Sequence, residues 1–157
     1  MDIYSSELGM KIIIINIYAP CLHRADFWTH LLNLSLVNLD NLILGGDLNF
    51  SIGYGESWGC NAKIDQLLDS MSHLMEKHQL IDIPMNKVHP IWCNRRTRDD
   101  ALARWLDRFI IKEQLIRGLS NYHQWVGVRG ISDHSPLYLE LFGPFPKSRA
   151  PFKFNSS

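Results

Sequence analysis

The sequence has no excess of either charge, which excludes a global electrostatic attraction to nucleic acid. Lys and Arg together number 16, as do Asp and Glu, so the formal net charge of the 157 residues is zero. Proteins that bind nucleic acid through their overall field carry a clear positive excess. Any contact with nucleic acid must therefore come from a local cluster of side chains.

Cysteine and long apolar stretches are also scarce. Cys21, Cys60 and Cys93 are far apart and odd in number, which fits a reducing compartment and buried thiols better than a disulfide framework. The most apolar run, Ile12 to Ile15, is only as long as a strand, and no basic region precedes a long apolar stretch near Met1. The sequence therefore predicts no membrane segment, no disulfide partner, and a nuclear or cytoplasmic location.

What is present suits one globular α/β domain. The composition is 46% hydrophobic and 20% charged, and the length allows a single core. Apolar residues at helical spacing predict two helices, and runs rich in β-branched and alternating apolar residues predict strands. The first helix is expected over 24–38, and the second from a cap at Asn61 to about residue 75. The strands are expected near 11–18, 42–47, 91–94, 104–110, 122–126 and 136–142. The strand over 11–18 should be buried on both faces. This order predicts a layered α/β sandwich with a mixed sheet.

The last residues differ in character from the rest. From Gly143 onward the chain combines proline, basic residues and serine, without a periodic apolar face. We therefore expect a domain over 1–142 and a linker-like tail over 143–157.

The stretch LILGGDLNF, residues 42 to 50, places polar side chains at the end of an apolar strand. In extended backbone Asp47 and Asn49 would point the same way. Gly45 and Gly46 would leave room for a phosphate or metal to approach the backbone. The alternative is an ordinary turn, since Gly, Asp and Asn are turn residues.

Two further polar clusters stand at predicted strand ends. Asp107 lies in an apolar strand and needs a partner, which could be Arg104, Arg108 or a histidine. Asp133 and His134 open the last strand; they could be a turn cap and a structural histidine. Taken with Asp47, these oxygen ligands suggest Mg²⁺ or Mn²⁺ with a phosphate.

The motifs together resemble a known family. They are, in order, NIYAP at 16–20, GGDLNF at 45–50, WCNRR at 92–96, RWLDRF at 104–109 and SDHSPL at 132–137. The combination is similar to the endonuclease/exonuclease/phosphatase superfamily, and looks closest to the apurinic-type endonuclease domain of plant non-LTR (LINE-type) retrotransposons. PFKF at 151–154 also resembles the segment that joins this endonuclease to the reverse transcriptase. The resemblance implies a four-layer, DNase I-like α/β sandwich that hydrolyses phosphodiester bonds.

The resemblance also implies roles for individual residues. Asp47 would orient or deprotonate the attacking water, and Asn49 would hold the scissile phosphate. His134 would stabilise developing charge on that phosphate, with Asp107 fixing the imidazole tautomer. Tyr18 would donate to a phosphate oxygen. A positioned base and preorganised donors suit such a reaction.

A metal and DNA are the implied partners. Asp133, together with the aspartate of GGDLNF, would contact Mg²⁺ or Mn²⁺. Trp92, Asn94, Arg95 and Arg96 match a stretch on the family's DNA-binding face, where arginines could contact phosphates. The other interpretation is that the tryptophan is a core residue and the arginines lie in a solvated loop.

The sequence departs from the family in its first part. The family domain is about half as long again, and the strands that carry an asparagine and the principal glutamate metal ligand have no counterpart before Lys11. We therefore expect a partial sandwich that lacks its N-terminal portion, weak metal binding, weak or no activity, and exposure of the inner faces of 12–15 and 42–44. The alternatives are a non-catalytic retrotransposon remnant or interaction module, and a phosphatase of the same superfamily.

Overall fold

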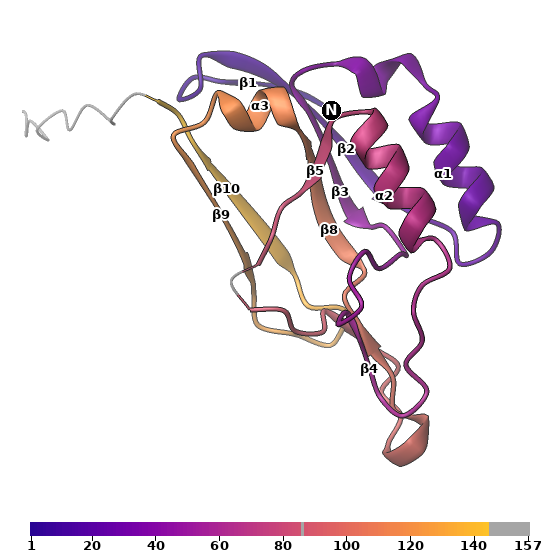
Figure 1. Ribbon diagram of the computed structural model, residues 1–157. Coiled ribbons are helices and arrows are strands. Elements are labelled where there is room, and N and C mark those ends of the chain that lie inside the picture. The colour runs from indigo at the N-terminus through magenta and orange to yellow at the C-terminus, as the bar shows by residue number, and fades with distance from the viewer. Residues whose placement is uncertain (86, 145–157) are drawn as a thin grey trace, which may run out of the picture.

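A mixed five-stranded sheet forms the centre of the computed structural model, which describes residues 1–85 and 87–144. Its order is β1-β2-β3-β8-β5 (Figure 1). Only β2 and β3 run parallel; the other neighbours are antiparallel. The strands are β1 (Asp2–Ser5), β2 (Met10–Tyr18), β3 (Leu42–Asp47), β5 (Leu80–Asp82) and β8 (Asp107–Lys112).

Helices cover one face of this sheet. They are α1 (Arg24–Leu32), the 3₁₀ turn η1 (Ser35–Asn38) and α2 (Leu68–Lys77), with α3 (Glu113–Arg117) following β8 at the end of the sheet (Figure 1). Trp28 and Met71 are each only 1% exposed and pack with Leu44 of the sheet in one core cluster. Burial of such side chains is the main stabilising term of this layer.

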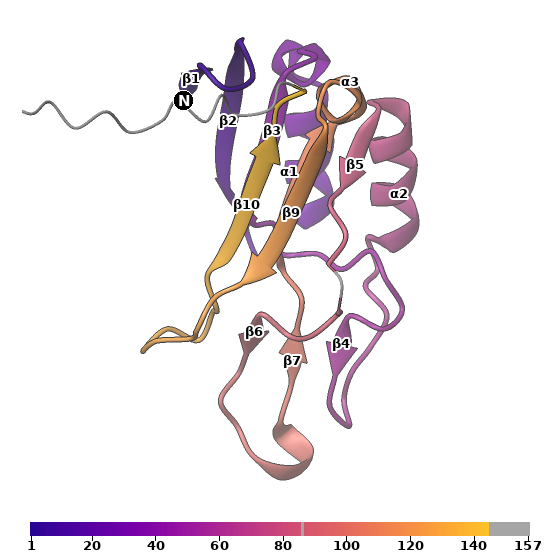
Figure 2. The same ribbon diagram turned by 90° about the vertical axis from the view of Figure 1, so that its left-hand side faces the viewer.

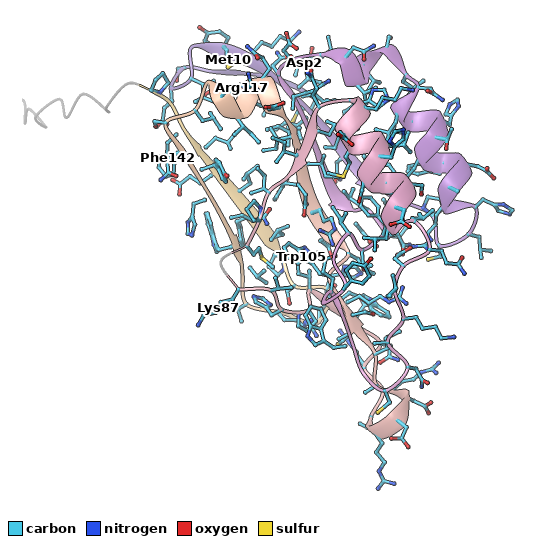
Figure 3. The ribbon with its side chains drawn as sticks, in the orientation of Figure 1. Asp2, Met10, Lys87, Trp105, Arg117 and Phe142 are labelled. Atoms are coloured by element: carbon cyan, nitrogen blue, oxygen red, sulfur yellow. The ribbon has the colours of Figure 1, made fainter. Side chains whose placement is uncertain are left out.

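A second, two-stranded sheet covers the opposite face (Figure 2). It consists of β9 (Asn121–Val126) and β10 (Leu137–Phe142), which pair antiparallel. Leu139 and Leu141 pack with Ile12 and Ile111 of the central sheet in a separate core cluster. Side chains thus join three layers: helices, a five-stranded sheet and a two-stranded sheet (Figure 3).

A small third sheet projects from one end of the molecule (Figure 2). It has the order β4-β7-β6, from β4 (Ser57–Trp58), β6 (Trp92–Cys93) and β7 (Ala103–Arg104), with the 3₁₀ turn η2 (Arg98–Asp100) in the loop between β6 and β7. We call this the hairpin sheet. Trp105 and Leu106 are buried where it joins the central sheet, so the single strand expected over 104–110 is divided between two sheets.

The two helices predicted from the sequence, α1 and α2, are shorter than expected. The first ends at Leu32 because Asn, Ser and Val, poor helix formers, follow it. The second begins at Leu68, and Asn61 donates its side-chain amide to the carbonyl of Asp99 instead of capping a helix. The carboxylate of Asp65 accepts the backbone N–H of Leu67, which forms a turn in place of the first helical residues.

Burial corrects several further expectations. Leu42, Ile43 and Leu44 are at most 3% exposed, so this strand's inner face is covered. The β2 strand is only partly buried, since Ile14 borders a cavity between the two larger sheets. Cys21 and Cys60 are exposed thiols, not buried ones. The predicted tail lies mostly outside the described residues, and the domain boundary at residue 142 stays a prediction.

Strands β1 and β4 and helix α3 were not expected from the sequence. They contain four, two and five residues, which is too short for periodicity to reveal. None of the helices in the described part of the chain combines the length and the hydrophobicity of a membrane-spanning segment.

Candidate functional site

The candidate site lies where β3 and β8 end side by side. Asp47 and Asp107 are cross-strand partners at the end of this antiparallel pair, so their side chains leave the sheet on the same face. Two carboxylates placed in this way repel each other unless a donor lies between them. The third group, His134, comes from the segment that leads into β10.

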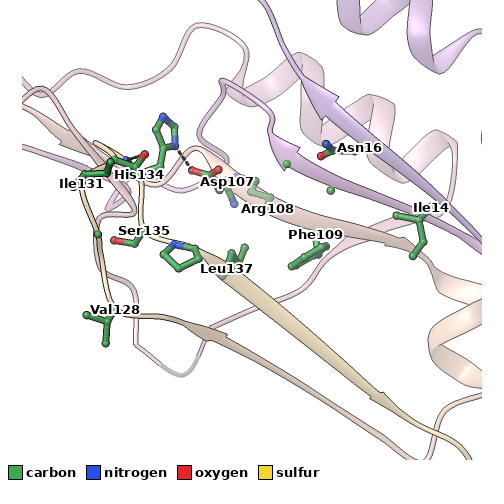
Figure 4. Close-up of a pocket in the computed structure, with 15 residues that line it drawn as sticks. Ile14, Asn16, Asp107, Arg108, Phe109, Val128, Ile131, His134, Ser135 and Leu137 are labelled. Atoms are coloured by element: carbon green, nitrogen blue, oxygen red, sulfur yellow. Dashed lines mark hydrogen bonds and ion pairs between the residues drawn. The ribbon is translucent and has the colours of Figure 1, made fainter. Parts of the chain in front are cut away.

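His134 joins the two carboxylates. Its Nδ1 lies 2.7 Å from Oδ2 of Asp107 (Figure 4). Its Nε2 lies 3.9 Å from Oδ2 of Asp47. The partner of Asp107 is therefore the histidine, and neither Arg104 nor Arg108. In the neutral tautomer that donates Nδ1–H to Asp107, Nε2 faces Asp47 with a free lone pair.

Burial raises the pKa of both carboxyl groups of the site. Desolvation raises the pKa of Asp47, and the nearby charge of Asp107 raises it further. The pKa of Asp107 is raised as well, mainly by burial, although its hydrogen bond with His134 opposes that shift. A carboxylate with a raised pKa is a stronger base near neutral pH.

Asn49 leaves the extended backbone that the sequence suggested. It adopts a positive φ of 54°, and its N–H donates to Oδ1 of Asp47 at 3.2 Å. The side-chain amide donates to the carbonyl of Ala19 and to Sγ of Cys21, both at 3.2 Å. The turn and the site hypotheses are thus compatible, because Asp47 and Asn49 line the same cleft.

The glycines of the motif have a packing reason. A Cβ on Gly45 would lie 2.7 Å from the Phe109 ring, and one on Gly46 would lie 2.2 Å from the carbonyl oxygen of Ile17. The Phe109 ring at Gly45 and the backbone of β2 at Gly46 thus exclude a side chain at these two positions, which gives both glycines a structural role.

Most of the predicted residues meet in one cleft of about 600 Å³. It is lined by Tyr18, Asp47, Asn49, Trp92, Asp133 and His134 among those predicted, with Cys21, Arg24, Leu102, Arg104 and Leu106 in addition. An adjoining cavity of about 660 Å³ lies between the two larger sheets and touches Asp107 and His134 (Figure 4). Its lining is mostly apolar, so the smaller, polar cleft is the better location for chemistry.

Residues of the hairpin sheet border this cleft. The indole Nε1 of Trp92 donates to Oδ2 of Asp133 at 3.0 Å, and this bond lowers the pKa of that carboxyl. Arg95 and Arg96 are exposed. Asn94 accepts the backbone N–H groups of Arg96 and Leu102, so its side chain shapes the loop. Trp92 is accordingly a half-buried edge residue and not a core residue.

The residues suited to a metal do not form a complete site. In the described ranges, no group of three or more His, Cys, Asp or Glu side chains is arranged to hold an ion. Asp47 already accepts a backbone N–H, and Asp133 accepts the Trp92 indole. The donor set therefore fits a tightly held divalent cation poorly.

Sequence reasoning missed Arg24, and it considered Arg104 only as a salt-bridge partner of Asp107. Arg24 forms a bidentate pair with Asp65 at 2.8 and 3.0 Å, and it also donates to the carbonyl of Asn49 at 2.6 Å. Arg104 lines the cleft from the central strand of the hairpin sheet. No local motif signals the first contact, because its partners are 25 and 41 residues away.

Comparisons with known proteins support the architecture. No family model matches the chain, and no curated protein matches it. A solved structure described as the endonuclease domain of TRAS1, a telomere-specific non-LTR retrotransposon, matches with a TM-score of 0.66 at 15% identity. The match covers 93% of this chain, and the chain spans 63% of that domain. At this identity the likeness shows the fold: the chain has the mixed α/β, DNase I-like fold of a non-LTR retrotransposon endonuclease domain.

Proposed function

We propose that this chain is, by descent, an endonuclease-type phosphodiester hydrolase that depends on a divalent metal and has weak or no activity by itself. The observation that carries the proposal is the histidine held between two carboxylates at the ends of β3 and β8. The fold likeness to a retrotransposon endonuclease domain supports the same class of reaction.

His134 and Asp107 would act together on the phosphate. Asp107 fixes the imidazole by its 2.7 Å contact with Nδ1, so that Nε2 faces the cleft. In its protonated form, His134 would donate from Nε2 to a phosphate oxygen and stabilise the charge that develops there. A fixed donor of this kind needs no reorganisation during the reaction.

Asp47 is the candidate for orienting or deprotonating the attacking water. Its carboxylate is close enough to Nε2 of His134, at 3.9 Å, for both to contact one oxygen atom. Asn49 would hold the scissile phosphate by exchanging its contact with the exposed Cys21 thiol. Tyr18, which is 82% exposed at the edge of the cleft, would donate its hydroxyl to a phosphate oxygen.

The proposed cofactor is Mg²⁺ or Mn²⁺, contacted by Asp47 and Asp133. When bound, the ion would neutralise negative charge on the phosphate. Its binding would be weak because few donors are free to contact it, and Mg²⁺ is usually held by only one or two protein carboxylates.

The proposed substrate is DNA. Trp92, Asn94, Arg95 and Arg96 lie on the hairpin sheet and the loop that follows β6, which projects beside the cleft (Figure 2). Its exposed arginines would contact backbone phosphates and position the duplex without reading its sequence.

Nicking of supercoiled plasmid or of an abasic duplex tests this function. We expect a low, Mg²⁺-dependent rate that His134→Ala abolishes, because the variant removes the donor from the phosphate. Arg117→Ala, on an exposed pair with Glu113 at the far end of β8, is the matched control and should leave the rate unchanged. Nicking that persists in His134→Ala would contradict the assigned role.

The second candidate is a non-catalytic retrotransposon remnant or interaction module. The observation in its favour is the absence, within the described residues, of a three-donor metal group. It predicts no nicking at any Mg²⁺ concentration, by the wild type or the control variant.

A further inference from the structure

Arg104 occupies a fixed position on the wall of the cleft. It belongs to β7, the central strand of the hairpin sheet, where its backbone pairs with Ser57 on one side and Trp92 on the other. Leu102, Arg104 and Leu106 all line the cleft, as expected for alternate residues of extended chain. Its side chain therefore enters the cleft from a backbone held on both edges.

Two other arginines, next to Asn49 and Asp107, are already paired. Arg24 uses its guanidinium on Asp65 and on the carbonyl of Asn49. Arg108 leaves β8 on the face opposite to Asp107 and pairs with Glu56 and Asp82. Both guanidinium groups are already engaged in ion pairs, so neither is available to bind a ligand in the cleft.

Arg104 differs from both. Its Nε is buried without a hydrogen-bond partner in the described structure. A buried donor of a charged group is costly to leave unpaired, and such a group calls for a partner that completes it. An anion in the cleft would be such a partner.

An anion in this cleft needs a positive charge beside it, and Arg104 supplies one. Asp47 and Asp133 border the same space and would repel a phosphate unless a cation offset them. Leu102 and Leu106, on either side of Arg104 along the strand, reduce contact with water and so strengthen the attraction between the guanidinium and an anion. The planar guanidinium also matches two phosphate oxygens at once.

We propose that Arg104 is a phosphate-binding residue of this cleft and contacts a backbone phosphate of the nucleic acid. The identification of the ligand as nucleic acid rests on the proposed function. The phosphate contact itself rests on the buried, unpartnered Nε and on the cleft that it lines.

The first test measures binding of a fluorescent duplex oligonucleotide in EDTA, where no hydrolysis occurs, over a series of salt concentrations. Arg104→Gln should weaken binding about tenfold. It should also reduce the slope of log K against log salt by about 0.9, which is the contribution of one phosphate contact. Arg104→Lys keeps the charge, so it should retain the slope while losing part of the affinity.

Arg117→Gln is the matched control, since it removes one exposed positive charge far from the cleft. It should leave the slope close to that of the wild type. A merely structural role for Arg104 would lower the melting temperature without changing the salt slope of the folded protein. Wild-type slope and affinity in Arg104→Gln would overturn the proposal and leave the proposed function standing.

The second test follows the Nε–H resonance of Arg104 in ¹H–¹⁵N spectra during titration with inorganic phosphate, and Arg104→Lys assigns the peak by its loss. We expect a saturable shift of that resonance. If phosphate shifts the resonance but the protein does not bind the duplex, the result would support the phosphate site and count against the proposed function. No shift with either ligand would overturn the proposal.

Discussion

A buried guanidinium joins three segments next to the site. Arg108 is 0% exposed and pairs with Glu56 and with Asp82, while its guanidinium carbon lies 4.8 Å from the centroid of the Trp105 ring. Removing one partner of such a group leaves an uncompensated buried charge, which costs about 3–5 kcal/mol. The network therefore fixes the loop after β3 and the β5 strand against the start of β8.

Asp82 in this network gives a pH dependence to stability. Burial raises its pKa from 3.8 to about 6, although the charge of Arg108 opposes the shift, and its Oδ1 is buried without a partner among the described residues. Between these two values the folded state holds a proton that the unfolded state has released. The free energy of unfolding should therefore fall as pH rises from about 4 to about 6.

Urea unfolding of the wild type and of Asp82→Asn across this range measures the effect. Asp82→Asn should flatten the decline because the amide does not titrate. Some decline should remain, since the pKa values of Asp47 and Asp107 are also raised. Parallel pH profiles for the two proteins would show that Asp82 does not titrate in this way.

At the scale of elements, the parallel pair of β2 and β3 depends on Gly46. This residue has a φ of 128°, and a Cβ there would come within 2.2 Å of the carbonyl oxygen of Ile17 on β2. The backbone conformation and the contact both exclude a side chain. The glycine thus lets the strand that ends at Asp47 lie against its neighbour.

Gly46→Ala should lower the free energy of unfolding by about 2 kcal/mol or more. Gly55→Ala is the matched control, since nothing lies within 4 Å of a Cβ at that position. It should change the stability by less than about 0.5 kcal/mol. Equal effects of the two substitutions in urea unfolding would refute the role assigned to Gly46.

The division between β7 and β8 is a second element-scale feature. One stretch of largely extended chain, residues 103 to 112, begins in the hairpin sheet and ends in the central sheet. The change of sheet at Trp105 and Leu106 places Arg104 on the wall of the cleft and Asp107 beneath His134. A continuous strand would have kept both residues in one sheet.

At the scale of the whole molecule, metal binding should be visible as a small gain in stability. An ion that binds the folded state stabilises it by RT ln(1 + [L]/Kd), which is about 0.4 kcal/mol when the concentration equals Kd. The available donors predict weak binding, so millimolar Mg²⁺ should raise the melting temperature by only about 1–2 °C.

Thermal unfolding with and without Mg²⁺ measures this shift, and Asp47→Asn should remove it. An unchanged melting temperature in the wild type would mean that no competent metal site exists, and would favour the non-catalytic interpretation. A shift several times larger would contradict the incomplete donor set of the described residues.

The sequence by itself determined the fold class and the set of side chains from which the site is built. Period-two and helical apolar patterns depend on local backbone geometry, so the strands that became β2, β3, β9 and β10 and the cores of both helices were predictable. Asp47, Asp107 and His134 were recognisable because each follows or opens an apolar strand.

Only the tertiary structure decided how these residues meet. The choice of His134 over an arginine as the partner of Asp107 depends on residues 27 positions apart in the chain. The positive φ of Asn49, the division of 103–112 between two sheets and the place of Arg104 on the wall of the cleft are likewise set by long-range packing. Local patterns carry no information on such contacts, because the free energy that selects them comes from burial and pairing between distant segments.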